Sequence, residues 1–191
     1  MVQELTFGSN FNQPVNNLPT KIQKLSFDWD FNQPVDNLPQ NIQYLAFGLK
    51  FNQPIDNLPP KIKELSFDRQ FNQPVDNLPS EIEKLYFGRD FNQPVNNLPS
   101  VIQQLTFGNS FNHPVYNLPN KLKILAFGWN FNQLVDNLPS GLQELTLEEE
   151  FNQPLGSFLP KGLQKLTISK DYTKTLNYVP VSVKIIFSSR F

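Results

Sequence analysis

The chain has 191 residues, with 17 prolines, 39% hydrophobic residues and a formal net charge of −1. Because an interior proline removes a helical hydrogen bond and clashes with the preceding turn, this proline content excludes a bundle of long helices. The balanced charge gives no overall attraction to nucleic acid or to an anionic membrane, and no apolar run is long enough to span a bilayer. We therefore expect neither nucleic acid nor a membrane as a partner.

The chain contains no cysteine, which excludes disulfides and thiolate metal sites. No Asn-x-Ser/Thr glycosylation site occurs among its many asparagines, and the first residues lack the basic flank and apolar run of a secretion signal. These features predict an intracellular protein.

The sequence repeats with a period of 20 residues. Phe-Asn-Gln-Pro begins at residues 11, 31, 51, 71, 91 and 151, and the variants Phe-Asn-His-Pro and Phe-Asn-Gln-Leu begin at 111 and 131. We count positions in each unit from its first Phe, so that Phe31 is position 1. The recurring apolar positions cannot form a closed core within one unit, but stacked coils bury them as continuous columns. The pattern predicts a single solenoid domain, residues 1–191, of about nine coils.

Residues 1–10 form an incomplete first coil, in which Val2, Leu5 and Phe7 occupy positions 12, 15 and 17. A strand with one unpaired edge and an exposed core end favour pairing with another chain. The sequence therefore predicts a homodimer through this end.

In each complete coil, positions 12 to 18 predict one short strand. Leu25 and Phe27 should face the core while Ser26 faces out, because successive side chains of a strand point to opposite faces. All coils run in the same direction, so the strands should form a parallel sheet.

The other half of each coil carries two prolines, which favour extended or polyproline-type backbone and oppose a helix. We therefore expect a mainly β solenoid with a concave sheet, an extended convex side and almost no helix. Without helices to spread the coils, its curvature should be gentle.

The motif Leu-Pro-x-x-Ile-x-x-Leu-x-Phe-Gly-x-x-Phe-Asn-Gln-Pro-Val resembles the FNIP repeat, a branch of the leucine-rich-repeat solenoids common in slime moulds and giant DNA viruses of amoebae. The resemblance covers residues 2–170. It implies a right-handed leucine-rich-repeat-like solenoid and protein–protein recognition, often as the substrate-reading part of F-box proteins. No F-box sequence precedes Val2, so we do not expect that role.

An asparagine at position 2 is the strongest polar signal. A side-chain amide stacked at one coil spacing can bond its neighbours and satisfy backbone groups that would otherwise be buried unpaired. We interpret this column as structural, and a second asparagine column at position 7 as a turn former. The column at position 2 comprises Asn12, Asn32, Asn52, Asn72, Asn92, Asn112, Asn132 and Asn152.

Candidate chemistry is sparse. Asp36, Asp56 and Asp76 occupy position 6 of adjacent coils, which suggests a hard-cation site or simply solvated turn carboxylates. Because no calcium-loop sequence is present, we predict no metal and no cofactor. His113, the single histidine, replaces the glutamine of the repeat, and neither a nucleophile elbow nor a glycine-rich phosphate loop occurs. We therefore expect no catalytic residue and no enzyme activity.

Positions 14, 16 and 19 vary between coils, so they can encode a partner without disturbing the core. Positions 14 and 16 project from the concave face, and position 19 lies in the following loop. Trp, Tyr and Arg most often anchor interfaces, whereas local packing of the two tryptophans is the alternative interpretation. The candidate partner-binding residues are Trp29, Tyr44, Leu49, Arg69, Tyr86, Arg89, Ile124 and Trp129.

Residues 151–191 are irregular: they contain one extra residue, and Tyr172 and Phe191 continue the Phe column at altered spacing. We expect these coils to cap the apolar end. The basic segment 161–191, which ends in Arg190 and Phe191, lies close in sequence to Glu148–Glu150. It can pair with this acidic run, recruit an acidic partner or remain solvated.

The leading prediction is a non-enzymatic scaffold that recognises a protein on its concave face. The main alternative is a structural or self-assembling repeat protein that associates through its uncapped end. An ice- or glycan-binding solenoid is a weaker alternative, because Tyr86 interrupts the small residues of position 16.

Overall fold

The computed structural model of the protein describes residues 2–156 and 159–188. Within these residues the chain contains ten short strands and no helix. The strands are β1 (Glu4–Phe7), β2 (Lys24–Phe27), β3 (Tyr44–Phe47), β4 (Glu64–Phe67), β5 (Lys84–Tyr86), β6 (Gln104–Thr106), β7 (Ile124–Ala126), β8 (Glu144–Leu147), β9 (Lys165–Ser169) and β10 (Lys184–Ser188). No helix in the described part of the chain could therefore cross a membrane.

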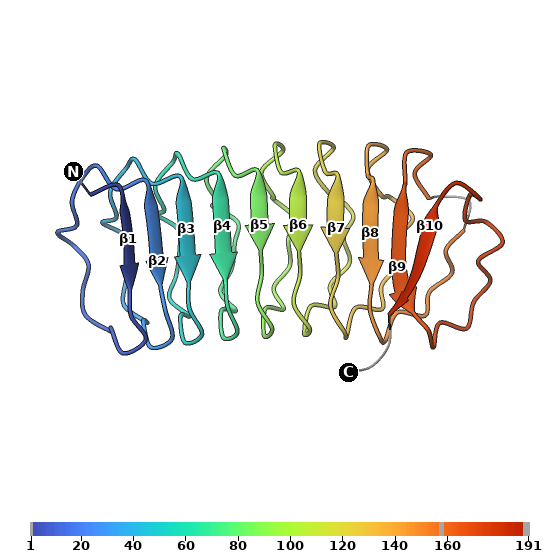
Figure 1. Cartoon of the computed structure of the whole chain (residues 1–191), viewed down its shortest axis with the longest axis horizontal. Coiled ribbons are helices and arrows are strands. Elements are labelled where there is room, and N and C mark those ends of the chain that lie inside the picture. The colour runs from blue at the N-terminus through green and yellow to red at the C-terminus, as the bar shows by residue number, and fades with distance from the viewer. Residues whose placement is uncertain (1, 157–158, 189–191) are drawn as a thin grey trace.

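All ten strands lie in one parallel sheet in sequence order. In Figure 1 each strand runs downward in front, and the chain returns behind it and advances to the right. This path is a right-handed coil, the hand that parallel crossovers almost always take. Leu25 pairs with Leu45, one full repeat away, and Leu45 pairs with Leu65 in the same way. The sequence repeat is thus also the register of the sheet.

The strands are shorter than the alternation of the sequence predicts. They begin at position 14 and end by position 17 in the regular coils, rather than covering positions 12 to 18. The turn after the second proline explains this difference, because the Ile42 N–H donates to the Pro39 carbonyl at 3.4 Å. The Gln23 carbonyl then accepts from both Gln43 N (2.8 Å) and Tyr44 N (3.1 Å) of the next coil. The pleated ladder begins only after this shared bond.

Two columns of Phe rings fill the core. The position 17 ring of one coil stacks on the position 1 ring that follows it, as in Phe47 and Phe51, whose centroids lie 3.8 Å apart at an interplanar angle of 10°. Phe51 also stacks on Phe71 of the next coil, at 6.1 Å. Both rings of each regular coil from residue 27 onward are buried. Stacked pairs of this kind add about 0.5–1.5 kcal/mol each beyond the area they bury.

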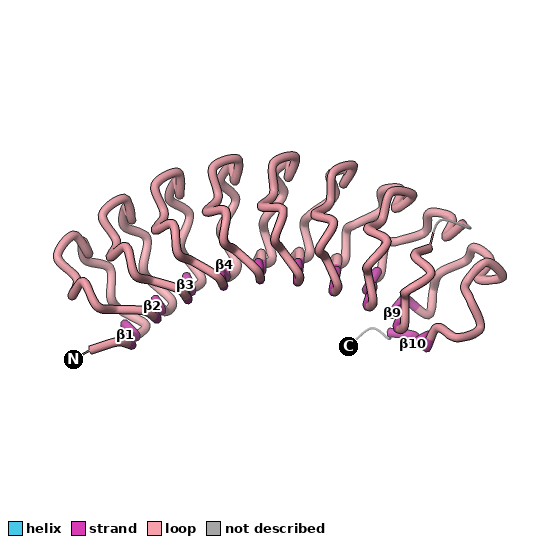
Figure 2. Tube along the Cα trace, turned by 90° about the horizontal axis from the view of Figure 1, so that it is seen from above, coloured by secondary structure: helices cyan, strands magenta, loops and turns pink. Residues whose placement is uncertain are grey.

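The solenoid forms an arc with the strands on its inner side and the loops fanned outward (Figure 2). The Phe columns give the reason. Next to the strand, the rings of Phe27 and Phe47 are 5.7 Å apart, whereas the rings of Phe31 and Phe51, further along each coil, are 6.0 Å apart. The coils therefore widen away from the sheet. The arc is marked rather than gentle, so the prediction of gentle curvature was wrong: the packing of bulky side chains spreads the outer halves without helices.

The last coils differ from the regular ones. The Tyr172 ring stacks on Phe151 at 6.1 Å. Its hydroxyl donates to the Gln153 carbonyl and accepts from Leu155 N–H, both at 3.1 Å. Thr173 donates to Asn152 Oδ1 through its backbone N–H and its hydroxyl. The two residues that differ from the repeat thus continue the aromatic and asparagine columns by one coil. Arg190 and Phe191 lie outside the described residues.

Candidate interaction surface

The asparagines of position 2 form a continuous ladder. Each side-chain oxygen accepts the backbone N–H of the asparagine one coil later, as in Asn52 N to Asn32 Oδ1 and Asn72 N to Asn52 Oδ1, both at 2.9 Å. The same contact recurs between successive coils from Asn12 to Asn152. These side chains are occupied in joining the coils, so they offer little to a ligand.

The glutamines of position 3 support this ladder, a role that the sequence analysis missed. Gln53 Nε2 donates to Asn32 Oδ1 at 3.1 Å, so one amide oxygen accepts from both a backbone and a side-chain donor. His113 takes the place of a glutamine, and its Nε2 lies 3.1 Å from the Asn92 carbonyl oxygen. Because a carbonyl can only accept, this contact requires the proton on Nε2. The recurrence of glutamine beside an invariant asparagine, with His113 as the one exception, was the available signal.

The carboxylates of position 6 are also engaged between coils. Asp36 Oδ1 accepts from Asn57 Nδ2, and Asp56 Oδ1 accepts from Asn77 Nδ2, both at 3.0 Å. The second asparagine column thus donates to the carboxylates of the preceding coil. In the described residues, no group of three or more His, Asp or Glu side chains is arranged to hold a metal ion.

Glycine at position 18 marks the closest approach of one coil to the next. A Cβ added at Gly108 would lie 1.9 Å from the Gly88 carbonyl oxygen, far inside contact distance. A Cβ added at Gly141, by contrast, would meet its nearest atom at 3.9 Å. The sequence showed that these glycines follow the strands singly, but only the stacked coils show what each one faces.

The concave sheet carries three of the candidate partner-binding residues, Tyr44, Tyr86 and Ile124, all half-buried. They lie among charged side chains, including Lys84, whose Nζ is 3.1 Å from Glu64 Oε2. Burial, and then the nearby Glu64 carboxylate, raises the pKa of Tyr86 above its ordinary value of 10.0, so its hydroxyl keeps its proton at neutral pH. This surface offers aromatic faces and hydroxyl groups between paired charges.

The other candidates form a row at position 19, along the edge where the strand arrows end in Figure 1. Trp29 and Trp129 are 54% and 49% exposed, Arg69 and Arg89 are exposed, and Leu49 is half-buried. The structure thus places the candidates in two parallel rows, one on the sheet and one beside it. No hydrogen bond or ring contact of either indole occurs within the described residues.

The repeat units match the family model described as FNIP Repeat in seven overlapping segments. These are residues 14–50, 31–70, 51–90, 71–110, 91–128, 111–150 and 134–171. The chain belongs to the FNIP repeat family. No curated protein sequence matches it at a significant level.

A solved structure has a similar solenoid fold. The crystal structure of CroV588, described as a novel circular LRR protein structure, is 41% identical with a TM-score of 0.86. The match covers 95% of this chain and 29% of that chain. The likeness identifies the fold as a leucine-rich-repeat-like solenoid. This chain spans less than a third of that protein's length, and the word circular describes that protein.

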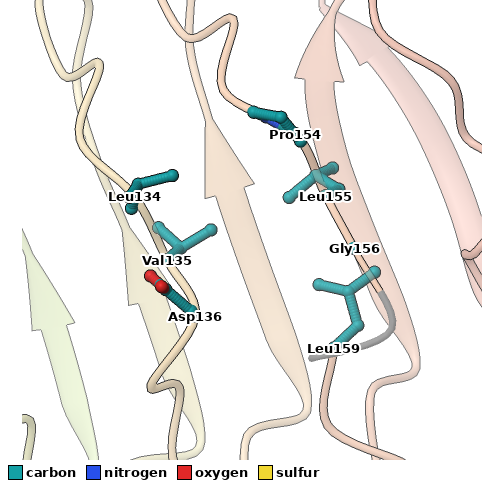
Figure 3. Close-up of a pocket in the computed structure, with 7 residues that line it drawn as sticks. All are labelled: Leu134, Val135, Asp136, Pro154, Leu155, Gly156 and Leu159. Carbon is teal, nitrogen blue, oxygen red and sulfur yellow. The ribbon is translucent and has the colours of Figure 1, made fainter.

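One hollow arises where the FNIP pattern is interrupted. Leu134 replaces the proline of position 4 and is exposed, and the next coil departs from the repeat after Leu155. Figure 3 shows the side chains of the two consecutive coils around this hollow, with the Asp136 carboxylate as the single charged group. Its volume is about 230 Å³, and it is mainly apolar. The lining residues are Leu134, Val135, Asp136, Pro154, Leu155, Gly156 and Leu159.

Proposed function

We propose that this FNIP protein is a non-enzymatic scaffold that binds a protein partner on its concave strand face. The observation that carries the proposal is the contrast between columns. Core positions keep one residue type from coil to coil, whereas position 14 changes on successive strands from Tyr44 to Glu64, Lys84, Gln104 and Ile124. Variation confined to exposed positions of a rigid sheet is what a binding surface requires.

The absence of a catalytic constellation in the sequence supports a binding role. The single histidine, His113, has its Nε2 in contact with the Asn92 carbonyl of the preceding coil, where it substitutes for a ladder glutamine. A general base needs a free nitrogen directed at a substrate proton. The proposal also places the protein inside the cell, on the evidence of the missing cysteines and glycosylation sites.

Tyrosine substitutions test the concave face. We expect the double variant Tyr44→Ala/Tyr86→Ala to lose a partner that the wild-type chain captures reproducibly from its native cell, because aromatic anchors dominate interface energies. Tyr116→Ala is the matched control, since Tyr116 is 70% exposed and lies away from the sheet at position 6. Circular dichroism checks folding. Retention of every partner by the folded double variant would contradict the proposal.

Self-association through the first coil is a second candidate, favoured by one observation. Phe7, Phe11 and Leu18 are only partly buried, and they line an open hollow of about 290 Å³ at this end of the solenoid. A second copy that covers these rings would bury them. Sedimentation across a range of concentrations tests this, with Phe7→Asp as the variant. A mass that stays monomeric at the highest concentration would exclude it.

A further inference from the structure

The row at position 19 has properties that the rest of the surface lacks. We call its stretch from Trp29 to Trp129 the rim row, which consists of Trp29, Leu49, Arg69, Arg89, Asn109 and Trp129. Ser9 and Glu149 hold position 19 in the coils on either side of this stretch. We infer that the rim row binds an extended peptide segment with acidic residues at its centre and an apolar side chain toward each end. The inference rests on the proposed function, and it adds the chemistry of the partner segment.

The backbone holds the rim row in register. Each of its carbonyls accepts a hydrogen bond from the residue at position 20 of the next coil. Lys50 N donates to the Trp29 carbonyl at 2.9 Å, and Asp90 N donates to the Arg69 carbonyl at 2.8 Å. The remaining members make the same bond, at 2.9 to 3.0 Å. The row therefore presents one side chain per coil, at the sheet spacing of about 4.8 Å.

The side chains at the two ends of the row are available for binding. Trp29 and Trp129 are the only tryptophans of the chain, and both occupy position 19. Each indole is about half exposed and makes no hydrogen bond or ring contact in the part of the chain that the structure describes. The core is complete without them, because Leu49, Arg69, Arg89 and Asn109 occupy the same position in other coils. Exposed tryptophan is the side chain most enriched at binding hot spots.

The centre of the row is cationic and unpaired. Arg69 and Arg89 lie on adjacent coils, and among the described residues no carboxylate lies within 4.0 Å of either guanidinium. Even Asp68 and Asp90, which are next to these arginines in the sequence, form no ion pair with them. By contrast, Lys50 on the same edge is paired with Asp30 at 2.8 Å. Two neighbouring guanidinium groups repel each other, and carboxylates bound between them in bidentate geometry would relieve that repulsion.

The spacing of the row sets the length of the ligand. Five coil steps separate Trp29 from Trp129, or about 24 Å at the sheet spacing, and the arginine pair lies midway. An extended peptide rises about 3.3 Å per residue, and its successive side chains point to opposite faces. Both end residues can therefore face the row only across an even number of steps, and about eight steps cover this distance. The complementary segment thus has apolar side chains at its first and ninth residues and acidic ones at its fourth to sixth, of which the fifth faces the arginine pair. A probe of this design is Ac-Phe-Ala-Ser-Glu-Glu-Glu-Ser-Ala-Phe-amide.

Intrinsic fluorescence provides a direct measurement, since both tryptophans belong to the row. Titration of the full chain with the probe should give a saturable change in tryptophan emission, and the affinity should fall with added salt. Arg69→Gln/Arg89→Gln should weaken binding at least about tenfold, because two charge-assisted contacts are lost. Lys50→Gln is the matched control. It also removes one positive charge from this edge, but that charge is already paired with Asp30, so binding should be unchanged.

Specific outcomes overturn the inference. A permuted peptide that carries its glutamates at the ends and its phenylalanines at the centre should bind at least about tenfold more weakly. Equal binding of the two peptides, equal binding by the double arginine variant with an unchanged circular dichroism spectrum, or no saturable change at millimolar probe would each refute it.

A different variant tests the proposed function independently of the rim row inference. Tyr44→Ala/Tyr86→Ala should keep the probe while losing the protein partner, because those side chains lie on the sheet rather than in the row. If the probe does not bind but this variant still loses the partner, only the rim row inference fails.

Discussion

The two Phe columns and the rim row run through the same coils, but the repeat fixes the residue type in the Phe columns and leaves it variable in the rim row. At position 1 the same ring recurs from Phe31 to Phe151, whereas position 19 changes from Trp29 to Arg69 within two coils. Both positions lie in the same 20-residue register, and both have hydrogen-bonded backbones: position 1 bonds within a local turn, and position 19 bonds to the next coil. The difference shows that the backbone at position 19 is held in register while its side chain varies freely, which is the arrangement that the proposed recognition role requires.

The largest expected effect contrasts one residue from each region. Phe71→Ala should destabilise the protein by about 3–5 kcal/mol, because it removes a fully buried ring that stacks on both neighbours of its column. Trp29→Ala should change the free energy of unfolding by less than about 0.5 kcal/mol. Urea denaturation of both variants measures this difference. A comparable loss in Trp29→Ala would show that the rim row is part of the packing.

A glycine substitution tests how closely the coils approach each other beside the rim row. Gly108→Ala should destabilise by about 1–3 kcal/mol, because its Cβ would overlap the Gly88 carbonyl and force two coils apart. Gly141→Ala is the matched control, with no atom closer than 3.9 Å to the added carbon. Thermal unfolding of the pair should show a lower midpoint for Gly108→Ala alone.

The asparagine ladder should contribute less per residue. Asn52→Ala leaves the Asn72 backbone N–H without its acceptor and removes the oxygen that Gln73 shares, at a cost of about 1–2 kcal/mol. Asn120→Ala, at the exposed and variable position 10, should be close to neutral. Hydrogen exchange of the Asn72 amide gives a local measurement. Unchanged exchange in Asn52→Ala would exclude the ladder as a source of stability.

The smallest effect concerns pH at the last regular coil. Burial, and then the neighbouring Glu149, raises the pKa of Glu148 above its ordinary value of 4.5. The folded state therefore binds this proton more tightly than the unfolded state, so stability falls as pH rises from the ordinary value through the raised one. Glu148→Gln should remove this decline, with a gain of less than about 0.5 kcal/mol near neutral pH.

Thermal midpoints measured at about pH 4 and about pH 7 check the prediction. Glu150→Gln is the control, because it removes the same charge from an exposed neighbour. An identical pH dependence in wild type and Glu148→Gln would contradict it.

The columns of the core could be predicted from the sequence because each consists of one apolar position that recurs every 20 residues. The positions of Leu25 and Phe27 face inward in the later regular coils, and the pairing of Leu25 with Leu45 in a parallel sheet follows from the shared direction of the coils. The asparagine column could be found in the same way, since an invariant polar residue in each coil must have a stacked neighbour.

Features that depend on the distance between coils could not be predicted. Glycine is needed at residue 108 because the Gly88 carbonyl of the preceding coil lies too close to leave room for a Cβ. The curvature depends on a difference of a few tenths of an ångström between the ring spacings of the two Phe columns. The hydroxyl of Tyr172, which bonds two backbone groups of the preceding coil, likewise depends on an irregular spacing. The curvature and the Tyr172 contacts leave no periodic signal, whereas the glycine of position 18 does recur but does not reveal which atom it faces.

The 20-residue repeat places equivalent surface residues at a constant spacing of one coil. Insertion or loss of one whole coil between Trp29 and Trp129 changes their separation by about 4.8 Å and leaves every internal column continuous, since each coil contacts only its neighbours. The length of the peptide that fits the proposed rim row site is therefore set by the number of coils between the two tryptophans. Duplication of a 60-nucleotide stretch of the gene would adjust it in a single step, without any change to the core.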